Sequence, residues 1–97
     1  MTDRFIHGTY AALYRPGRAW IPDRPITGQP LGAHAAYLLD LHARDKVLMG
    51  GPFANGRGGL VILRAADAAE AEALIAADPA VAAGVLAAEV HPWRRLA

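Results

Sequence analysis

The sequence contains no cysteine and no serine. The missing thiols exclude disulfide bonds and thiolate metal sites, and the two absences together remove two common covalent nucleophiles. The chain also lacks a run of about 18 apolar residues and the apolar stretch of an export signal, so we expect neither a membrane span nor secretion and place the protein by default in the cytoplasm. Ten basic and nine acidic residues, with no basic run, do not favour nucleic acid as a partner.

The length of 97 residues predicts one domain, residues 1–97, with a single core. Hydrophobic residues make up 54% of the chain, but 22 of them are alanine, which adds more to helix propensity than to buried area. Because a thin core of this kind gains from burial against a second copy, we expect a homo-oligomer.

Residues 47–64 form the segment around which the rest of the chain is arranged. Two apolar, β-favouring runs flank Asn55-Gly56, a pair that accepts positive φ. The segment therefore predicts a β-hairpin that turns near Gly56. Pro52 cannot donate to a ladder and marks an edge or a strand end.

The N-terminal third combines a strand with a long connection. Residues 4–14 are rich in aromatics and apolar on both faces, which predicts a central strand, with His7 near an exposed strand end. Residues 15–30 hold four prolines, so neither helix nor ladder should persist there. A loop of this length suits a lid anchored by Trp20, and the alternative is a solvated connection that Trp20 pins to the domain.

Residues 31–44 predict a helix with one apolar arc, and the arc contains His34 in the first turn. A polar ring buried there needs a partner, and the positive helix N-terminus disfavours its protonation. Two interpretations remain open at this point. His34 is either a core histidine bonded to a backbone carbonyl or a functional group.

The sequence after the hairpin predicts a second helix and a last strand. Asp67 and Glu70 resemble a capping box, and the helical stripe that follows extends to Asp78. Asp78 before Pro79 is also typical of an N-cap, so capping alone could account for it. Residues 85–94 predict the final strand, with Pro92 marking an edge or its end and Trp93 packing as an anchor.

The predicted order of elements is strand, helix, strand, strand, helix, strand. Right-handed crossovers then give a ferredoxin-like βαββαβ sandwich of the α+β class, with both helices on one face of an antiparallel sheet. The other face would be bare and apolar. We therefore expect a homodimer in which two sheets face each other.

Several segments together resemble the YCII-related (YciI-like) family of the dimeric α+β barrel group. They are Arg15-Pro16-Gly17 to Trp20, His34 in LGAHAAYL, GGPF at Gly50 to Phe53 with the following GRGGLVIL, Asp78-Pro79-Ala80-Val81 with Gly84, and Val90-His91-Pro92-Trp93. They span nearly the whole chain in the family's order. Gly50 stands where a subset of the family has aspartate in a DGPF motif, so the chain resembles the general group more than that subset.

The resemblance implies a ferredoxin-like dimer whose active site pairs the helix histidine, His34, with the aspartate of the Asp-Pro motif, Asp78. It also brings a range of reactions, because one member resembles a dehydrochlorinase and barrel relatives include lactone isomerases and cofactor-free monooxygenases. A histidine oriented by a carboxylate is a general acid or base. We therefore expect cofactor-independent proton-transfer chemistry, of the lyase or isomerase type, on a small aromatic or acidic metabolite.

Such chemistry needs groups that steady a developing oxyanion. The candidates for binding the substrate are Arg15, Arg18 and Arg57, the lid residue Trp20, and the backbone N–H groups of Gly50 and Gly51. No cofactor is expected, and no metal, because the four histidines lack ligand spacing.

Two other functions use the same sequence features. A non-catalytic dimer could bind a small ligand in the same pocket, with His34 and Asp78 as a satisfied buried pair. An RNA-binding sheet shares the strand order, but residues 60–63 lack the aromatic signature of such sheets.

Overall fold

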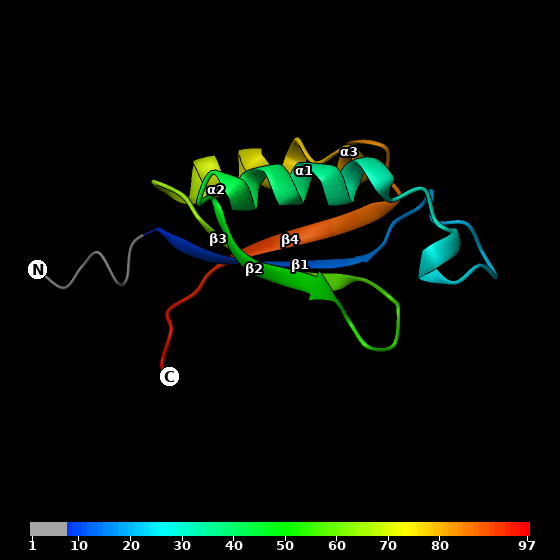
Figure 1. Ribbon diagram of the computed structural model, residues 1–97, viewed down its shortest axis with the longest axis horizontal. Helices are drawn as coiled ribbons and strands as arrows, with labels where there is room; N and C mark the ends of the chain where they lie inside the picture. Colours follow the sequence, from blue (N-terminus) through cyan, green and yellow to red (C-terminus); the bar gives the residue numbers. More distant parts are fainter. Residues whose placement is uncertain (1–7) are drawn as a thin grey trace, which may run out of the picture.

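The structure is a computed structural model that describes residues 8–97. Its elements are β1 (Thr9–Pro16), the 3-10 turn η2 (Ile26–Gly28), α1 (Gly32–Ala43), β2 (Val47–Pro52), β3 (Gly59–Arg64), α2 (Ala68–Ala76), α3 (Pro79–Ala82) and β4 (Leu86–Pro92). The four strands form one sheet in the order β2-β3-β1-β4, and every pairing is antiparallel. The helices cover one face of this sheet (Figure 1).

This arrangement confirms the predicted ferredoxin-like α+β fold. β1 lies between β3 and β4, as its two apolar faces predicted, and β2 and β4 form the edges. Pro52 and Pro92 are the last residues of these two edge strands, where a missing N–H costs no ladder hydrogen bond. The hairpin turns at Asn55-Gly56, where Gly56 has φ +74° and its N–H donates to the Phe53 carbonyl.

The sequence placed the end of the first strand two residues too early. β1 continues through Arg15 and Pro16, which pair with Ala87 and Leu86 of β4. The connection was also predicted to lack any ladder, yet the N–H groups of Gly17 and Ala19 donate to the carbonyls of residues 85 and 84. Residues 4–7 of the predicted strand, including His7, lie outside the described residues.

The connection between β1 and α1 is an ordered loop. The buried side chain of Gln29 accepts from the Ile21 N–H at 2.8 Å and donates to the carbonyls of Ile21 and Arg24. These side-chain bonds hold the proline-rich segment in place without strand pairing. The segment also contains one 3-10 turn, η2. Trp20 is partly buried and packs against the hydrophobic core.

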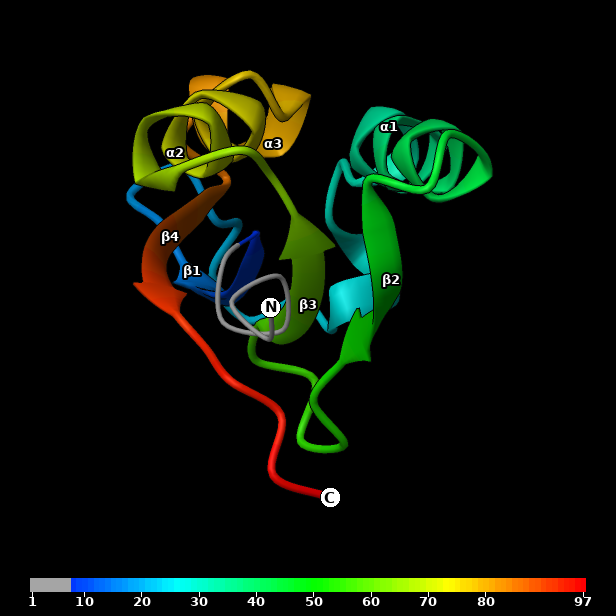
Figure 2. The same cartoon turned by 90° about the vertical axis from the view of Figure 1, so that its left-hand side faces the viewer.

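The core lies between the sheet and the helices. The helix-facing side chains of the central strands are Tyr10, Ala12 and Tyr14 of β1 with Val61 and Leu63 of β3, and all are buried. Apolar residues of α2 and α3, among them Ala71, Ile75 and Ala80, complete the core above β1 and β4. In Figure 2, α2 and α3 lie over the β4 and β1 side of the sheet, and α1 lies over β2.

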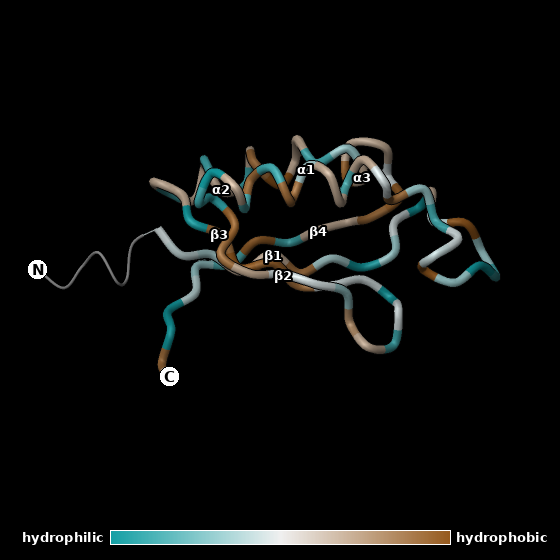
Figure 3. The backbone as a smooth tube through the Cα atoms, in the orientation of Figure 1, coloured by the Kyte–Doolittle hydropathy of each residue, from teal (hydrophilic) through white to brown (hydrophobic). Residues whose placement is uncertain are grey.

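The opposite face of the sheet carries no helix among residues 8–97. By strand alternation this face carries the apolar side chains of Leu13, Leu60 and Ile62, and Met49 is 64% exposed there. Figure 3, which colours the backbone by residue hydropathy, shows long hydrophobic stretches along the strands. Trp93, predicted to be an anchor, is instead 40% exposed, because it follows the last strand beyond the region that the helices cover. Within the described part of the chain, no helix is long and apolar enough to cross a membrane.

Candidate active site

Asp78 lies where α2 ends and α3 begins, and its side chain is fully buried. Its extended backbone (φ −60°, ψ 126°) breaks the helix, and Pro79 starts the next one. One carboxylate oxygen, Oδ1, accepts from the Ala80 N–H at 2.9 Å, which is an N-cap bond. The predicted capping role is therefore present, and it occupies only one of the two oxygens.

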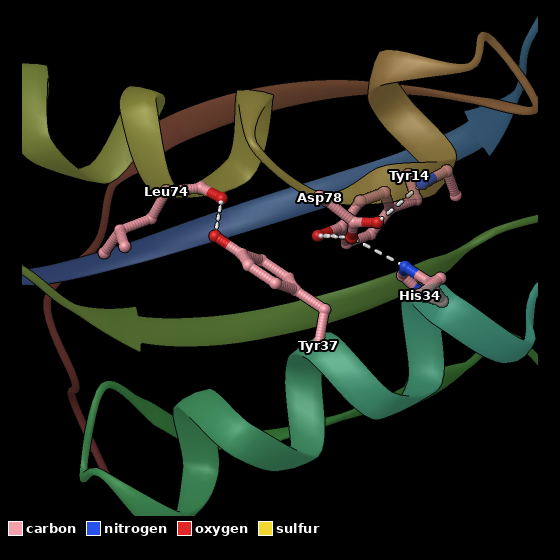
Figure 4. Close-up of polar contacts among 6 residues, drawn as sticks. Tyr14, His34, Tyr37, Leu74 and Asp78 are labelled. Carbon is pink, nitrogen blue, oxygen red and sulfur yellow. Dashed lines mark hydrogen bonds and ion pairs between the residues drawn. The ribbon is translucent and has the colours of Figure 1, made fainter.

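The second oxygen of Asp78 faces α1. His34, in the first turn of that helix, places Nδ1 2.6 Å from Asp78 Oδ2, and the Tyr14 hydroxyl of β1 donates to the same oxygen at 3.3 Å (Figure 4). An ionised carboxylate only accepts hydrogen bonds, so beside an ionised Asp78 the Nδ1 nitrogen of His34 is the one that donates. Three elements that are distant in sequence thus meet at one buried carboxylate.

The remaining ring nitrogen of His34, Nε2, has no hydrogen-bond partner among the described residues. No side-chain nitrogen or oxygen in that part of the structure is both buried and unpaired, so Nε2 is open to the surroundings of the ring. The His34 side chain is 17% exposed and borders a cavity. The ring thus contacts Asp78 through Nδ1, while Nε2 is left accessible for a further hydrogen bond.

Tyr14 is held neutral beside this pair. Burial, and then the negative charge of Asp78, raise the pKa of the Tyr14 hydroxyl far above its ordinary value. Its ring also contacts that of His34 edge to face, with centroids 5.3 Å apart. Tyr14 is thus a hydrogen-bond donor and a packing surface for His34, and it does not titrate near neutral pH.

The cavity has a volume of about 650 Å³ and lies between α1 and the β2–β3 hairpin. Its lining is mostly aliphatic, and its polar side chains are those of Tyr14, His34 and His42. His42 is oriented by a contact of 2.8 Å between Nδ1 and the Val47 carbonyl. Apolar cavities with a few polar side chains are typical of small-molecule binding sites.

The structure brings together some of the predicted site residues. His34 and Asp78 are in contact, and Gly50 and Gly51 line the cavity. The other four predicted substrate-binding residues are not among its lining residues. Arg15, Arg18 and Arg57 are exposed, with Arg57 in the hairpin turn, and Trp20 packs against the core. The connection instead contributes Ile26 to the cavity wall.

Sequence reasoning missed three polar residues around the pair. Tyr14 and Tyr37 were assigned to apolar faces, and His42 received no role. The hydrogen-bond partner of Tyr14 is 64 residues away and that of Tyr37 is 37 residues away, whereas that of His42 is five residues away. Only the contact of His42 could therefore have been sought as a local one. Within residues 8–97, no group of three or more His, Asp or Glu side chains is placed to hold a metal ion.

The fold and this site define a small α+β protein with a histidine–aspartate pair at the end of an apolar cavity. A search against protein families matches the YCII-related domain to residues 20–94. The chain therefore belongs to the YCII-related family, as its motifs predicted.

A solved structure of another protein is similar to this chain over most of the length of both. It is the 5-chloro-2-hydroxyhydroquinone dehydrochlorinase of Burkholderia phenoliruptrix AC1100, in complex with 2,5-dihydroxybenzoquinone. The two chains share 26% identity with a TM-score of 0.67, over 90% of this chain and 95% of the other. No curated protein matches the sequence.

Proposed function

We propose that the protein is a cofactor-independent acid–base enzyme that removes a proton from a small, weakly acidic aromatic compound. The observation that carries the proposal is the 2.6 Å contact between His34 Nδ1 and the fully buried Asp78, at a histidine that also lines the cavity. A carboxylate that orients an imidazole in this way sets its tautomer and stabilises the imidazolium that forms after proton transfer.

In this proposal Nε2 of His34 takes the proton. A chlorinated hydroquinol would react as its keto tautomer, in which the carbon that carries chlorine is tetrahedral. When a hydroxyl joined to that carbon through a C=C bond loses its proton, the O–H electron pair forms a C=O bond, the C=C bond shifts toward the C–Cl carbon, and chloride leaves with the electrons of the C–Cl bond. The net result is loss of HCl, with the proton returned to water from His34. The structural relative is named for a dehydrochlorination, which supports this reaction class.

The lining of the cavity supports the choice of ligand. No arginine, lysine, aspartate or glutamate belongs to it, so a carboxylate or phosphate would enter without a counter-charge. A phenol or quinol is neutral when it binds and offers hydroxyl groups to the two histidines. The ligand in the structure of the relative, 2,5-dihydroxybenzoquinone, is likewise a six-membered ring that carries hydroxyl groups.

We also propose that two copies pair through the open face of the sheet. Leu13 and Leu60 are only partly buried on this face and Met49 is 64% exposed, although all three are apolar. Covering them would remove a contiguous apolar surface from water. Light scattering at micromolar concentration should give about twice the mass of one chain, and a monomer at that concentration would contradict dimerisation.

The catalytic proposal is tested by chloride release from 5-chloro-2-hydroxyhydroquinone. His34→Asn should lower turnover about 10²- to 10⁴-fold, because it removes the general base. Asp78→Asn should also lower turnover while its amide still caps α3, since asparagine caps as well as aspartate does. Asp40→Asn, on an exposed site of α1, is the matched control and should leave turnover unchanged.

The outcomes separate the enzyme from a binding protein. If 2,5-dihydroxybenzoquinone binds in the His34-dependent manner but the wild type releases no chloride and exchanges no substrate proton, the protein is a ligand-binding dimer. If His34→Asn retains full turnover, the assignment of the base is wrong. If Asp78→Ala costs about 0.5–2 kcal/mol of stability without any effect on turnover, Asp78 is only a cap.

A further inference from the structure

Two side-chain hydrogen bonds connect α1 with the α2–α3 segment within the described part of the chain. One is the contact between His34 and Asp78, and the other runs from the Tyr37 hydroxyl to the Leu74 carbonyl at 2.7 Å. Tyr37 follows His34 by three residues, and Leu74 precedes Asp78 by four. The two bonds therefore lie about one helical turn apart and cross the same gap between helices (Figure 4).

The Leu74 carbonyl needs an outside donor because of the way α2 ends. In a continuing helix the N–H of residue 78 would donate to this carbonyl. Here that N–H donates to Ile75 instead, at 3.1 Å, because the chain turns extended at Asp78 to begin α3. The break that aims the Asp78 carboxylate at His34 thus frees the Leu74 carbonyl, and the Tyr37 hydroxyl takes it up.

α1 has few other restraints on the side of the cavity. Leu41 is its only buried residue, and the cavity occupies the space beneath the rest of this helix. Apolar packing therefore holds the helix less firmly than it holds α2, where Ala71 and Ile75 are buried. A hydrogen bond that spans the gap has a correspondingly large influence on where His34 lies.

We infer that Tyr37 is a positioning residue, which holds α1 at the distance from α2 that keeps the His34 ring on Asp78. Its hydroxyl is bonded to the Leu74 carbonyl, Tyr37 is not among the residues that line the cavity, and it takes no part in proton transfer. The inference concerns the geometry of the pair and holds whether or not the protein is an enzyme.

The test is ¹⁵N-edited NMR of the His34 ring in Tyr37→Phe, which keeps the aromatic ring and removes only the hydroxyl. In the wild type, Nδ1 should carry the proton in one dominant tautomer. In Tyr37→Phe, the two ring ¹⁵N shifts should move at least halfway toward those of Asp78→Asn, because the ring loses its fixed partner. With an active enzyme, turnover should fall several-fold more than KM rises.

Lys46→Met provides the matched control. It removes the contact between Lys46, in the turn that follows α1, and Glu70 of α2, 3.5 Å apart, at an exposed position far along α2 from Asp78. Its His34 spectrum should equal that of the wild type. If Tyr37→Phe lowers the melting temperature yet leaves the His34 shifts unchanged, Tyr37 only packs the helices and the inference is overturned. A spectral change of equal size in both variants would overturn it as well.

Discussion

The two halves of the helical layer differ in how they meet the sheet. Above β1 and β4, the helices α2 and α3 present alanine and isoleucine, and Ala71, Ile75 and Ala80 are at most 3% exposed. Above β2 and β3, α1 buries only Leu41 and leaves a cavity of about 650 Å³. We call the α2–α3 side the closed half, which supplies most of the packed core, and the α1 side the open half, which contains the cavity.

The difference originates in side-chain size at the hairpin. Gly50 and Gly51 of β2, with Gly58 and Gly59 at the start of β3, bring no side chains to a region where other strands contribute leucine and valine. The His34–Asp78 pair lies on the boundary, because Asp78 comes from the closed half and His34 from the open one. The proposed base is thus free to meet a ligand while its partner is held rigidly.

The largest effect on stability is expected from the closed half. Ile75→Ala removes a side chain that is 2% exposed and should cost about 2–5 kcal/mol, because the packed surroundings cannot collapse into the space. Leu38→Ala, on the wall of the cavity, should cost less than about 2 kcal/mol, because its side chain is already partly exposed. Denaturant unfolding of both variants measures the difference. Equal losses would show that the two halves are packed alike.

Adding a side chain to the glycines that line the cavity should lower the affinity for a ligand more than it lowers the free energy of unfolding. A Cβ on Gly50 would lie 2.9 Å from Val61 Cγ2 and 3.1 Å from the Leu60 carbonyl, so Gly50→Ala should strain the hairpin by about 1–3 kcal/mol and narrow the cavity. A Cβ on the adjacent Gly51 meets nothing within 4 Å, and Gly51→Ala should stay within about 0.5 kcal/mol. Titration with 2,5-dihydroxybenzoquinone compares the two. If Gly50→Ala binds as tightly as the wild type, the ligand does not contact this part of β2.

The smallest effect concerns the alkaline limit of stability. The pKa of Tyr14 is raised in the folded protein, so above pH about 10 the unfolded chain loses this proton first and stability falls as the pH rises. Tyr14→Phe should cost about 0.5–1.5 kcal/mol at neutral pH through the lost hydrogen bond to Asp78, and it should unfold less steeply with pH above 10. Melting temperatures between pH 8 and 11 test this. Parallel curves for both proteins would assign the alkaline loss to other groups.

The architecture could be predicted from the sequence because local patterns encode it, whereas the pairing of His34 with Asp78 was implied by the family resemblance. Apolar runs around Asn55-Gly56 specify a hairpin, and helical spacing places His34 and Asp78 on the buried sides of their helices. The family motifs added the statement that these two residues belong together. The contact itself confirms only the geometry, and the chemistry remains the proposal tested above.

Spacing along the chain could not show which other side chains reach the pair. Tyr14 and Asp78 are 64 residues apart and meet because β1 runs at the centre of the sheet beneath the start of α3. The predicted Arg15, Arg18 and Arg57 are not among the residues that line the cavity, and their binding of a substrate stays a prediction. Hydrophobic periodicity determined the elements and their buried faces, because it is a local property. Tertiary packing alone decided that one carboxylate would both cap α3 and hold His34, because its two oxygens point to elements that the sequence keeps far apart.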